Sequence, residues 1–173
     1  MKLDLANTEG LILLVPGAGW KAKMWHPEKF NAVAKICIDH GKTVLISGSK
    51  GEFELCKAIT KDLDRKKVRL LIDDLELLIS LLPHLSCCLG SDSGVSHLAA
   101  AAGVKTIQLF CPTNPDFSAE KRENVTVLRS SCPLKSDLFQ YCTTIPLLTC
   151  DRKECMDISV DQVITEMERM GVL

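Results

Sequence analysis

The sequence predicts an α/β domain built on a doubly wound parallel sheet. Six short aliphatic runs alternate with longer amphipathic segments along residues 10–130, which is the pattern of βαβ units joined by right-handed crossovers. The first run is apolar at every position from Leu11 to Val15, as expected of a strand buried on both faces. Six such strands suit the order 3-2-1-4-5-6 of a Rossmann-like sheet.

The expected elements follow from apolar runs, caps and stop signals. Strands are expected at residues 10–15, 43–47, 68–72, 86–89, 105–110 and 125–128. Pro27 suits the first turn of the first helix and Gly41 ends it. Asp73 and Glu76 have the spacing of a capping box for a helix that runs to about Leu82. The remaining helices are expected over residues 52–63, from 93 to a stop at Gly103, and over 159–171, where Ser159 and Gln162 form a second capping box.

The chain of 173 residues is long enough for one domain with its own core. We expect a single domain over residues 1–173, divided into a leader at 1–9, a six-stranded core at 10–130, a cysteine-containing segment at 131–158 and a last helix at 159–171.

Charge and hydropathy exclude several classes of partner. The net charge of −1 gives no electrostatic footprint for nucleic acid or for an anionic membrane, so any phosphate-binding group must be local. No apolar run reaches the ~18 residues of a membrane span, and Met1-Lys2-Leu3-Asp4 is too polar to open a signal peptide. We expect a cytoplasmic protein with at most peripheral membrane contact.

The most informative stretch runs from Gly90 to His97, between the fourth strand and an alanine-rich helix. Asp92 or Ser93 can cap that helix, and the backbone N–H groups that follow would then point past the strand end. Such a helix start suits a phosphate. An ordinary helix cap is the alternative.

A second unusual loop covers residues 16–26, after the first strand. In the order 3-2-1-4-5-6 the first and fourth strands are neighbours at the switch point, where ligands bind outside the carboxyl ends. Topology alone therefore brings the two loops to one crevice.

Two familiar motifs fit this chain poorly. Residues 17–22 match the dinucleotide fingerprint G-x-G-x-x-A. However, the following helix is expected to begin only at Pro27, and no acidic residue lies at the end of the second strand. A NAD-dependent oxidoreductase therefore remains a minor alternative. Residues 90–94 resemble a nucleophile elbow around Asp92. The only later histidine is His97, one helical turn away, which excludes a hydrolase on geometry.

Several residues together resemble a known family. They are Pro16-Gly17-Ala18, Lys23, Glu52, Asp92-Ser93-Gly94 with His97 and the alanines after it, and Leu109-Phe110-Cys111-Pro112-Thr113. This set resembles the C-terminal half of the bacterial lipopolysaccharide heptosyltransferases, glycosyltransferase family 9. The tail, with Cys132-Pro133, Cys142, Cys150 and Cys155-Met156, is similar to the cysteine-bearing tail of that family.

The resemblance implies one half of a GT-B glycosyltransferase, which holds the nucleotide sugar. It implies that Asp92, Ser93, Gly94 and His97 contact the diphosphate and sugar of an ADP-sugar, that Lys23 neutralises phosphate charge, and that Glu52 reaches the ribose or base. Gly17 and Thr113 complete the expected binding residues. Without the resemblance, Lys23 is a solvated lysine, Glu52 a first-turn acid, Thr113 a turn residue, and His97 as easily a packing residue as a ligand contact.

The implied reaction is inverting transfer of heptose or a related sugar from an ADP-sugar to a lipopolysaccharide-type acceptor, without a cofactor or an obligatory metal. The acceptor-binding N-terminal half of the family, where the base is expected, has no counterpart in this sequence. We therefore expect these residues alone to be inactive and to need a further domain or partner chain. A non-catalytic nucleotide-binding or interaction module is the alternative from another functional class.

The cysteines do not form a recognisable framework. There are nine of them, an odd number, and five lie in apolar patterns where free cysteine behaves as a small hydrophobe. Cys132, Cys142, Cys150 and Cys155 are too widely spaced for the close pairs of most structural zinc sites. Free thiols or a partial disulfide are favoured, and zinc is the alternative.

Overall fold

The computed structural model describes residues 10–130, 142 and 153–173. The six strands are parallel in the order β3-β2-β1-β4-β5-β6, which confirms the predicted topology. They are β1 (Leu11–Val15), β2 (Thr43–Gly48), β3 (Val68–Ile72), β4 (Leu85–Ser91), β5 (Thr106–Phe110) and β6 (Val125–Arg129). The leader expected at residues 1–9 lies outside the described residues.

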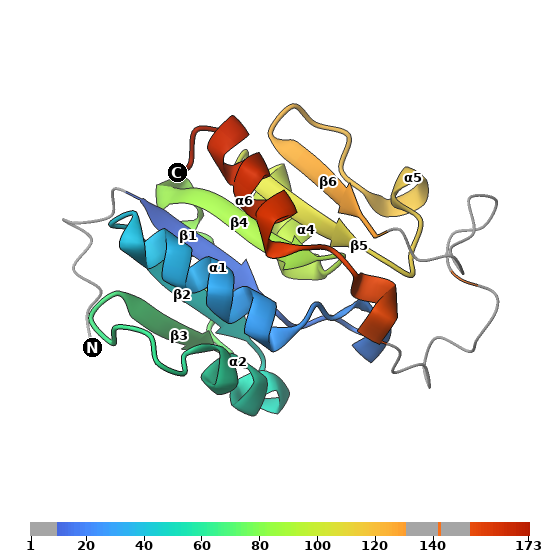
Figure 1. Cartoon of the computed structure of the whole chain (residues 1–173). Coiled ribbons are helices and arrows are strands. Elements are labelled where there is room, and N and C mark those ends of the chain that lie inside the picture. The colour runs from blue at the N-terminus through green and yellow to red at the C-terminus, as the bar shows by residue number, and fades with distance from the viewer. Residues whose placement is uncertain (1–9, 131–141, 143–152) are drawn as a thin grey trace.

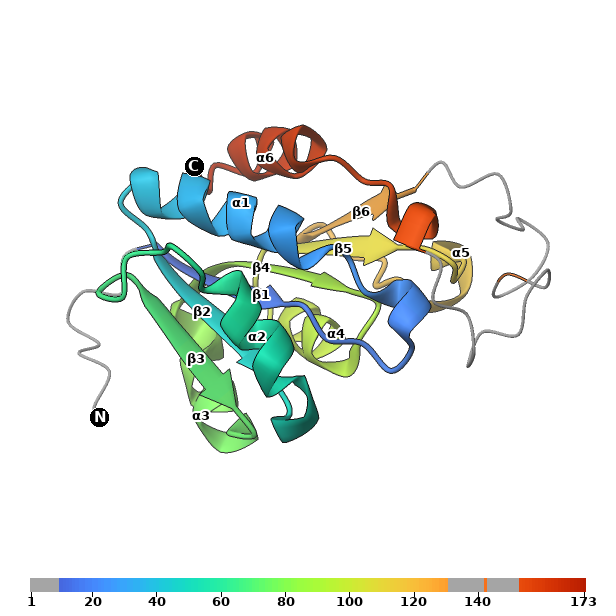
Figure 2. The same cartoon turned by 60° about the horizontal axis from the view of Figure 1, so that its bottom comes forward.

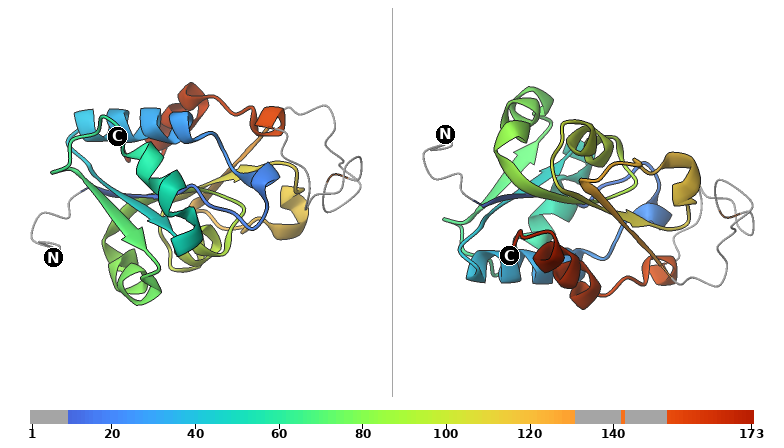
Figure 3. Two further views of the ribbon diagram at one scale, coloured as in Figure 1. Left: turned by 90° about the horizontal axis from the view of Figure 1, so that it is seen from below. Right: turned by 90° about the horizontal axis from the view of Figure 1, so that it is seen from above.

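Helices cover both faces of the sheet (Figures 1 and 2). One face carries α1 (Pro27–Asp39), α2 (Phe53–Ile59) and α6 (Val160–Arg169), and the other carries α3 (Leu75–Leu81) and α4 (Gly94–Ala101). The short α5 (Pro115–Ser118) follows β5. Figure 3 shows the sheet edge-on between these two layers.

Alternation along the strands divides the core in two. In β1, Ile12 and Leu14 pack with α1 and α2, whereas Leu11, Leu13 and Val15 pack with α3 and α4. All five are buried, because a strand between two helical layers has no face left for water. The continuous apolar runs of the sequence are thus explained.

Three expected boundaries were wrong. The helix expected over residues 52–63 is a 3₁₀ turn at Lys50–Glu52 followed by α2, which ends at Ile59. Asp74, not Asp73, caps α3, with its Oδ1 3.0 Å from the Leu77 nitrogen, and Asp73 occupies the turn with a φ of 55°. The fourth strand continues through Gly90 and Ser91, so the turn after it is shorter than expected.

The chain before α6 is held against the loop after β1. The indole Nε1 of Trp25 donates to the Ile158 carbonyl at 2.9 Å, and the ring is buried edge-on to Phe30 at 5.0 Å. Ser159 and Gln162 form the predicted capping box at the start of α6. Trp25 therefore joins the C-terminal helix to the loop that enters the crevice.

We expect Trp25→Ala to lower the free energy of unfolding by about 3–5 kcal/mol, because it leaves a large cavity and removes one of the two side-chain hydrogen bonds to the Ile158 carbonyl. Urea denaturation measures this change. Phe117→Ala, at a side chain that is 58% exposed, is the control and should stay within about 0.5 kcal/mol of wild type. Equal effects of the two substitutions would contradict the packing role of Trp25.

Candidate functional site

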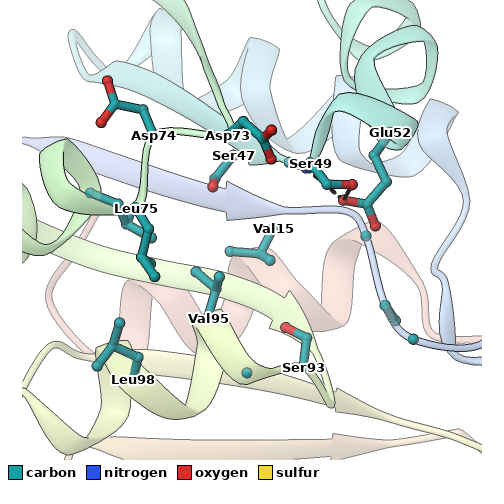
Figure 4. Close-up of a pocket in the computed structure, with 16 residues that line it drawn as sticks. Val15, Ser47, Ser49, Glu52, Asp73, Asp74, Leu75, Ser93, Val95 and Leu98 are labelled. Carbon is teal, nitrogen blue, oxygen red and sulfur yellow. Dashed lines mark hydrogen bonds between the residues drawn. The ribbon is translucent and has the colours of Figure 1, made fainter.

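A crevice of about 650 Å³ opens at the carboxyl ends of β1, β2 and β4 (Figure 4). Gly17, Ala18 and Gly19 line it from the loop after β1, and Ser93 and Gly94 line it from the start of α4. The predicted convergence of the two loops is confirmed. Its position is the switch point of the sheet, where ligands of doubly wound folds bind.

Glu52 faces this crevice from the 3₁₀ turn after β2. The Ser49 backbone nitrogen and hydroxyl both donate to Glu52 Oε2 at 2.8 Å, which fixes the carboxylate. Its Oε1 lies against Gly17, where a Cβ would overlap it. A glycine is therefore needed at position 17 for this carboxylate to occupy its place, and the carboxylate can accept hydrogen bonds from hydroxyls.

The far end of the crevice combines apolar and acidic groups that the sequence analysis did not single out. Val15, Leu75, Leu78, Val95 and Leu98 form its apolar lining, and Asp73 and Asp74 stand at its rim. Leu75 is 55% exposed and belongs to this lining (Figure 4). A flat apolar group with polar edges would cover this surface.

The start of α4 lies at the other end. Ser93 is the N-cap, and its backbone nitrogen lies 3.3 Å from Ser96 Oγ. The first-turn N–H groups that begin at Gly94 have no carbonyl of the helix to bond. No acidic residue occupies this turn, so the positive end of the helix can receive an anion.

Beside the crevice, Asp92 joins Lys23, His97 and Thr113 in one hydrogen-bonded group, the Asp92 cluster. Lys23 Nζ donates to Asp92 Oδ2 at 2.6 Å and Thr113 Oγ1 donates to the same oxygen at 2.9 Å. His97 Nε2 lies 2.9 Å from Oδ1. The side chain of Asp92 is only 9% exposed, so the ion pair with Lys23 is protected from screening.

Asp92 stays ionised in this setting. Burial acts to raise its pKa, but hydrogen bonds from His97, Lys23 and Thr113 and the charge of Lys23 outweigh burial and hold the pKa well below its usual range. The carboxylate therefore organises its donors rather than exchanging a proton near neutral pH.

Lys23 makes more contacts than a solvated surface lysine would. Besides Oδ2 it donates to the Asp92 carbonyl at 3.2 Å, and its ammonium lies 4.6 Å from the Trp20 ring centroid. An ammonium has three N–H donors, and its two hydrogen bonds to described residues leave one donor for an anion.

The eight predicted residues thus fall into two adjoining groups. Gly17, Glu52, Ser93 and Gly94 line the crevice, and Lys23, Asp92, His97 and Thr113 form the Asp92 cluster. They meet where Asp92 precedes Ser93. Trp20, Gln108 and Glu120, which also contact the cluster, were missed.

The dinucleotide fingerprint does not have its usual geometry. Lys21–Lys23 is a 3₁₀ turn and α1 begins only at Pro27, whereas the fingerprint needs a helix that opens at the second glycine.

The described residues include no group of three His, Cys, Asp or Glu side chains placed to hold a metal ion. Of the tail cysteines, Cys142 and Cys155 are buried, and Cys132 and Cys150 lie outside the described residues. In the part of the chain that the structure describes, no helix is long and apolar enough to cross a membrane.

Comparison with known proteins gives the family. Glycosyltransferase family 9 (heptosyltransferase) matches residues 2–146. The chain belongs to glycosyltransferase family 9. Lipopolysaccharide heptosyltransferase 1 of Pseudomonas aeruginosa is 28% identical over 154 residues, 87% of this chain and 42% of the relative. Lipopolysaccharide heptosyltransferase 2 of Escherichia coli is 28% identical over 134 residues, 74% of this chain and 38% of the relative.

Solved structures agree on the fold of this family 9 chain. The E. coli ADP-heptose lipopolysaccharide heptosyltransferase II superposes with a TM-score of 0.76 at 24% identity, over 95% of this chain and 47% of that one. E. coli heptosyltransferase WaaC with ADP gives a TM-score of 0.74 at 18% identity, over 95% and 45%. The chain therefore spans less than half the length of these relatives.

The low pKa of Asp92 predicts a particular loss of stability in acid. A carboxyl whose pKa is lower in the folded than in the unfolded protein contributes stability above the unfolded pKa of about 3.9. That contribution disappears as the pH falls through the folded value. We expect unfolding free energy to fall between about pH 6 and pH 2 by on the order of 2 kcal/mol more in wild type than in Asp92→Asn.

Urea titrations at several pH values measure this difference. Asp39→Asn, at an exposed position of α1, should follow the wild-type pH profile. Identical acid profiles of wild type and Asp92→Asn would contradict the charged state assigned to Asp92.

Proposed function

We propose that these residues form the donor-binding, C-terminal half of a GT-B heptosyltransferase and hold an ADP-sugar. The observation that carries the proposal is the adjacency of an apolar crevice, the N-terminus of α4 and a partly buried cation at one switch point. A nucleoside diphosphate matches this arrangement, because it has a flat base at one end, a hydroxylated ribose in the middle and two anionic phosphates at the other end.

The groups of the crevice fit the parts of this ligand. The base covers Leu75 and Val95, and the ribose hydroxyls donate to Glu52, whose carboxylate Ser49 already orients. The diphosphate lies at the N-terminus of α4 and near Lys23, which offers its remaining N–H donor beside the positive end of the helix.

The proposed reaction is inverting transfer of heptose or a related sugar. An acceptor hydroxyl attacks the anomeric carbon, the bond from that carbon to the diphosphate oxygen breaks, and ADP leaves with the bonding electrons. Lys23 and the helix start stabilise the negative charge that develops on the leaving oxygen. The acceptor proton passes to a base that we assign to the acceptor-binding half, so the present residues bind donor without transferring sugar.

The acceptor in this proposal is of lipopolysaccharide type and the step takes place in the cytoplasm. The names of the relatives, which are lipopolysaccharide heptosyltransferases, support this acceptor class.

Calorimetric titration with ADP, UDP and NAD tests the proposal. We expect selective binding of ADP, weakened about ten- to a hundredfold in Lys23→Ala, because a charge-assisted hydrogen bond to phosphate is lost. Lys21→Ala, two residues away and exposed, is the matched control and should bind like wild type. Preferential binding of NAD, or equal losses in both variants, would contradict the donor-site assignment.

Glu52→Gln tests the ribose contact separately. We expect about tenfold weaker ADP binding, because the amide is a poorer acceptor than the carboxylate. Binding of inorganic pyrophosphate should stay unchanged, since pyrophosphate has no ribose. Glu54→Gln, at an exposed position of α2, is the control. A parallel loss of pyrophosphate binding would place Glu52 at the phosphates instead.

A further inference from the structure

Gln108 is a buried amide in the middle of the apolar strand β5. It has no exposed surface, and Ile107 and Leu109 beside it belong to the core. Its Nε2 lies 3.2 Å from His97 Nδ1, and its Oε1 is buried with no hydrogen-bond partner among the residues that the structure describes. Burying an amide with one unpaired group is unfavourable, so the contact with His97 needs an explanation beyond packing.

The contact of the other ring nitrogen of His97, Nε2, indicates which nitrogen carries the hydrogen. Nε2 lies 2.9 Å from Asp92 Oδ1. An ionised carboxylate can only accept hydrogen bonds, so Nε2 carries a hydrogen and donates it to Asp92. At Nδ1 the Gln108 amide nitrogen is itself a donor, and it needs a lone pair there. The two contacts together describe a neutral imidazole with its hydrogen on Nε2.

Other charges surround the ring. Glu120 Oε1 is 3.9 Å from Nδ1, and Glu120 is also paired with Arg122 at 3.1 Å. Lys23 faces the opposite oxygen of Asp92. The Gln108 amide nitrogen lies closer to Nδ1 than Glu120 does, and as a donor it needs the lone pair of Nδ1.

We propose that Gln108 is a positioning residue that holds His97 as the neutral tautomer with hydrogen on Nε2, committing that N–H to Asp92. The functional part of this inference rests on the proposed donor site. With His97 neutral, the positive charge offered to a diphosphate comes from Lys23 and the start of α4. Asp92 then receives three fixed donors, from Lys23, His97 and Thr113, which keeps Lys23 in place.

Nitrogen-15 NMR of histidine-labelled protein tests the tautomer directly. The nucleotide-free chain is measured at about pH 7.5, where an unperturbed imidazole is mostly neutral, and His97→Gln assigns the signals. We expect hydrogen on Nε2 and a hydrogen-bonded lone pair on Nδ1. In Gln108→Met the Nδ1 shift should move toward that of an unbonded lone pair or of a protonated nitrogen.

Two further variants separate positioning from packing. Gln108→Asn keeps a buried amide but shortens its reach, and should change the Nδ1 signal as Gln108→Met does. Thr106→Val, whose hydroxyl bonds the Val104 carbonyl on the same strand, should leave it unchanged. Hydrogen on Nδ1 in the wild-type protein, or an unchanged Nδ1 signal in Gln108→Asn, overturns the proposal.

Affinity for ADP supplies the functional readout. One lost hydrogen bond that positions the cluster should weaken ADP binding about three- to tenfold in Gln108→Asn. Undiminished affinity in that variant overturns the positioning role. Failure of wild type to bind ADP overturns the proposed function and leaves the NMR result on the tautomer standing.

Discussion

An ionised Asp92 at the end of β4 holds together side chains that are distant in sequence. It accepts hydrogen bonds from Lys23 in the loop after β1, from His97 in α4 and from Thr113 after β5. Parallel topology brings these segments to one edge of the sheet, but only a shared acceptor fixes their relative positions. Burial makes the carboxylate costly unless it is satisfied, and these three donors together offset that cost.

The need to satisfy the buried Asp92 carboxylate explains how charge is distributed in the site. The crevice beside the Asp92 cluster is largely apolar, with acidic groups at its rim, and would attract no phosphate by itself. Lys23 and the start of α4 lie directly beside Asp92 and Ser93, where both can receive an anion, while Lys50 pairs with Asp73 at the rim. A carboxylate would otherwise repel phosphate, but here its charge is balanced by Lys23 and its oxygens face their donors. The same residue therefore positions a cation without presenting an unpaired anion.

Much of the fold could be predicted because parallel strands buried on both faces are continuous apolar runs, as in β1. Topology then located the crevice without any knowledge of side chains. The length of α2 could not be predicted, since the Ser49 and Glu52 hydrogen bonds that form a 3₁₀ turn depend on local geometry. Gln108 was missed for a related reason. A polar residue in a buried strand predicts that its side chain has a hydrogen-bond partner. That the partner is His97 depends on how α4 crosses the sheet.

The hydrogen bond from Trp25 to the Ile158 carbonyl has a thermodynamic consequence. Lys29 donates to the same carbonyl at 2.8 Å, so two side chains near the start of α1 hold the chain that leads into α6. Lys23 lies only two residues before Trp25. The free energy of these hydrogen bonds therefore stabilises two segments at once, the chain that leads into α6 and the short loop that carries Lys23.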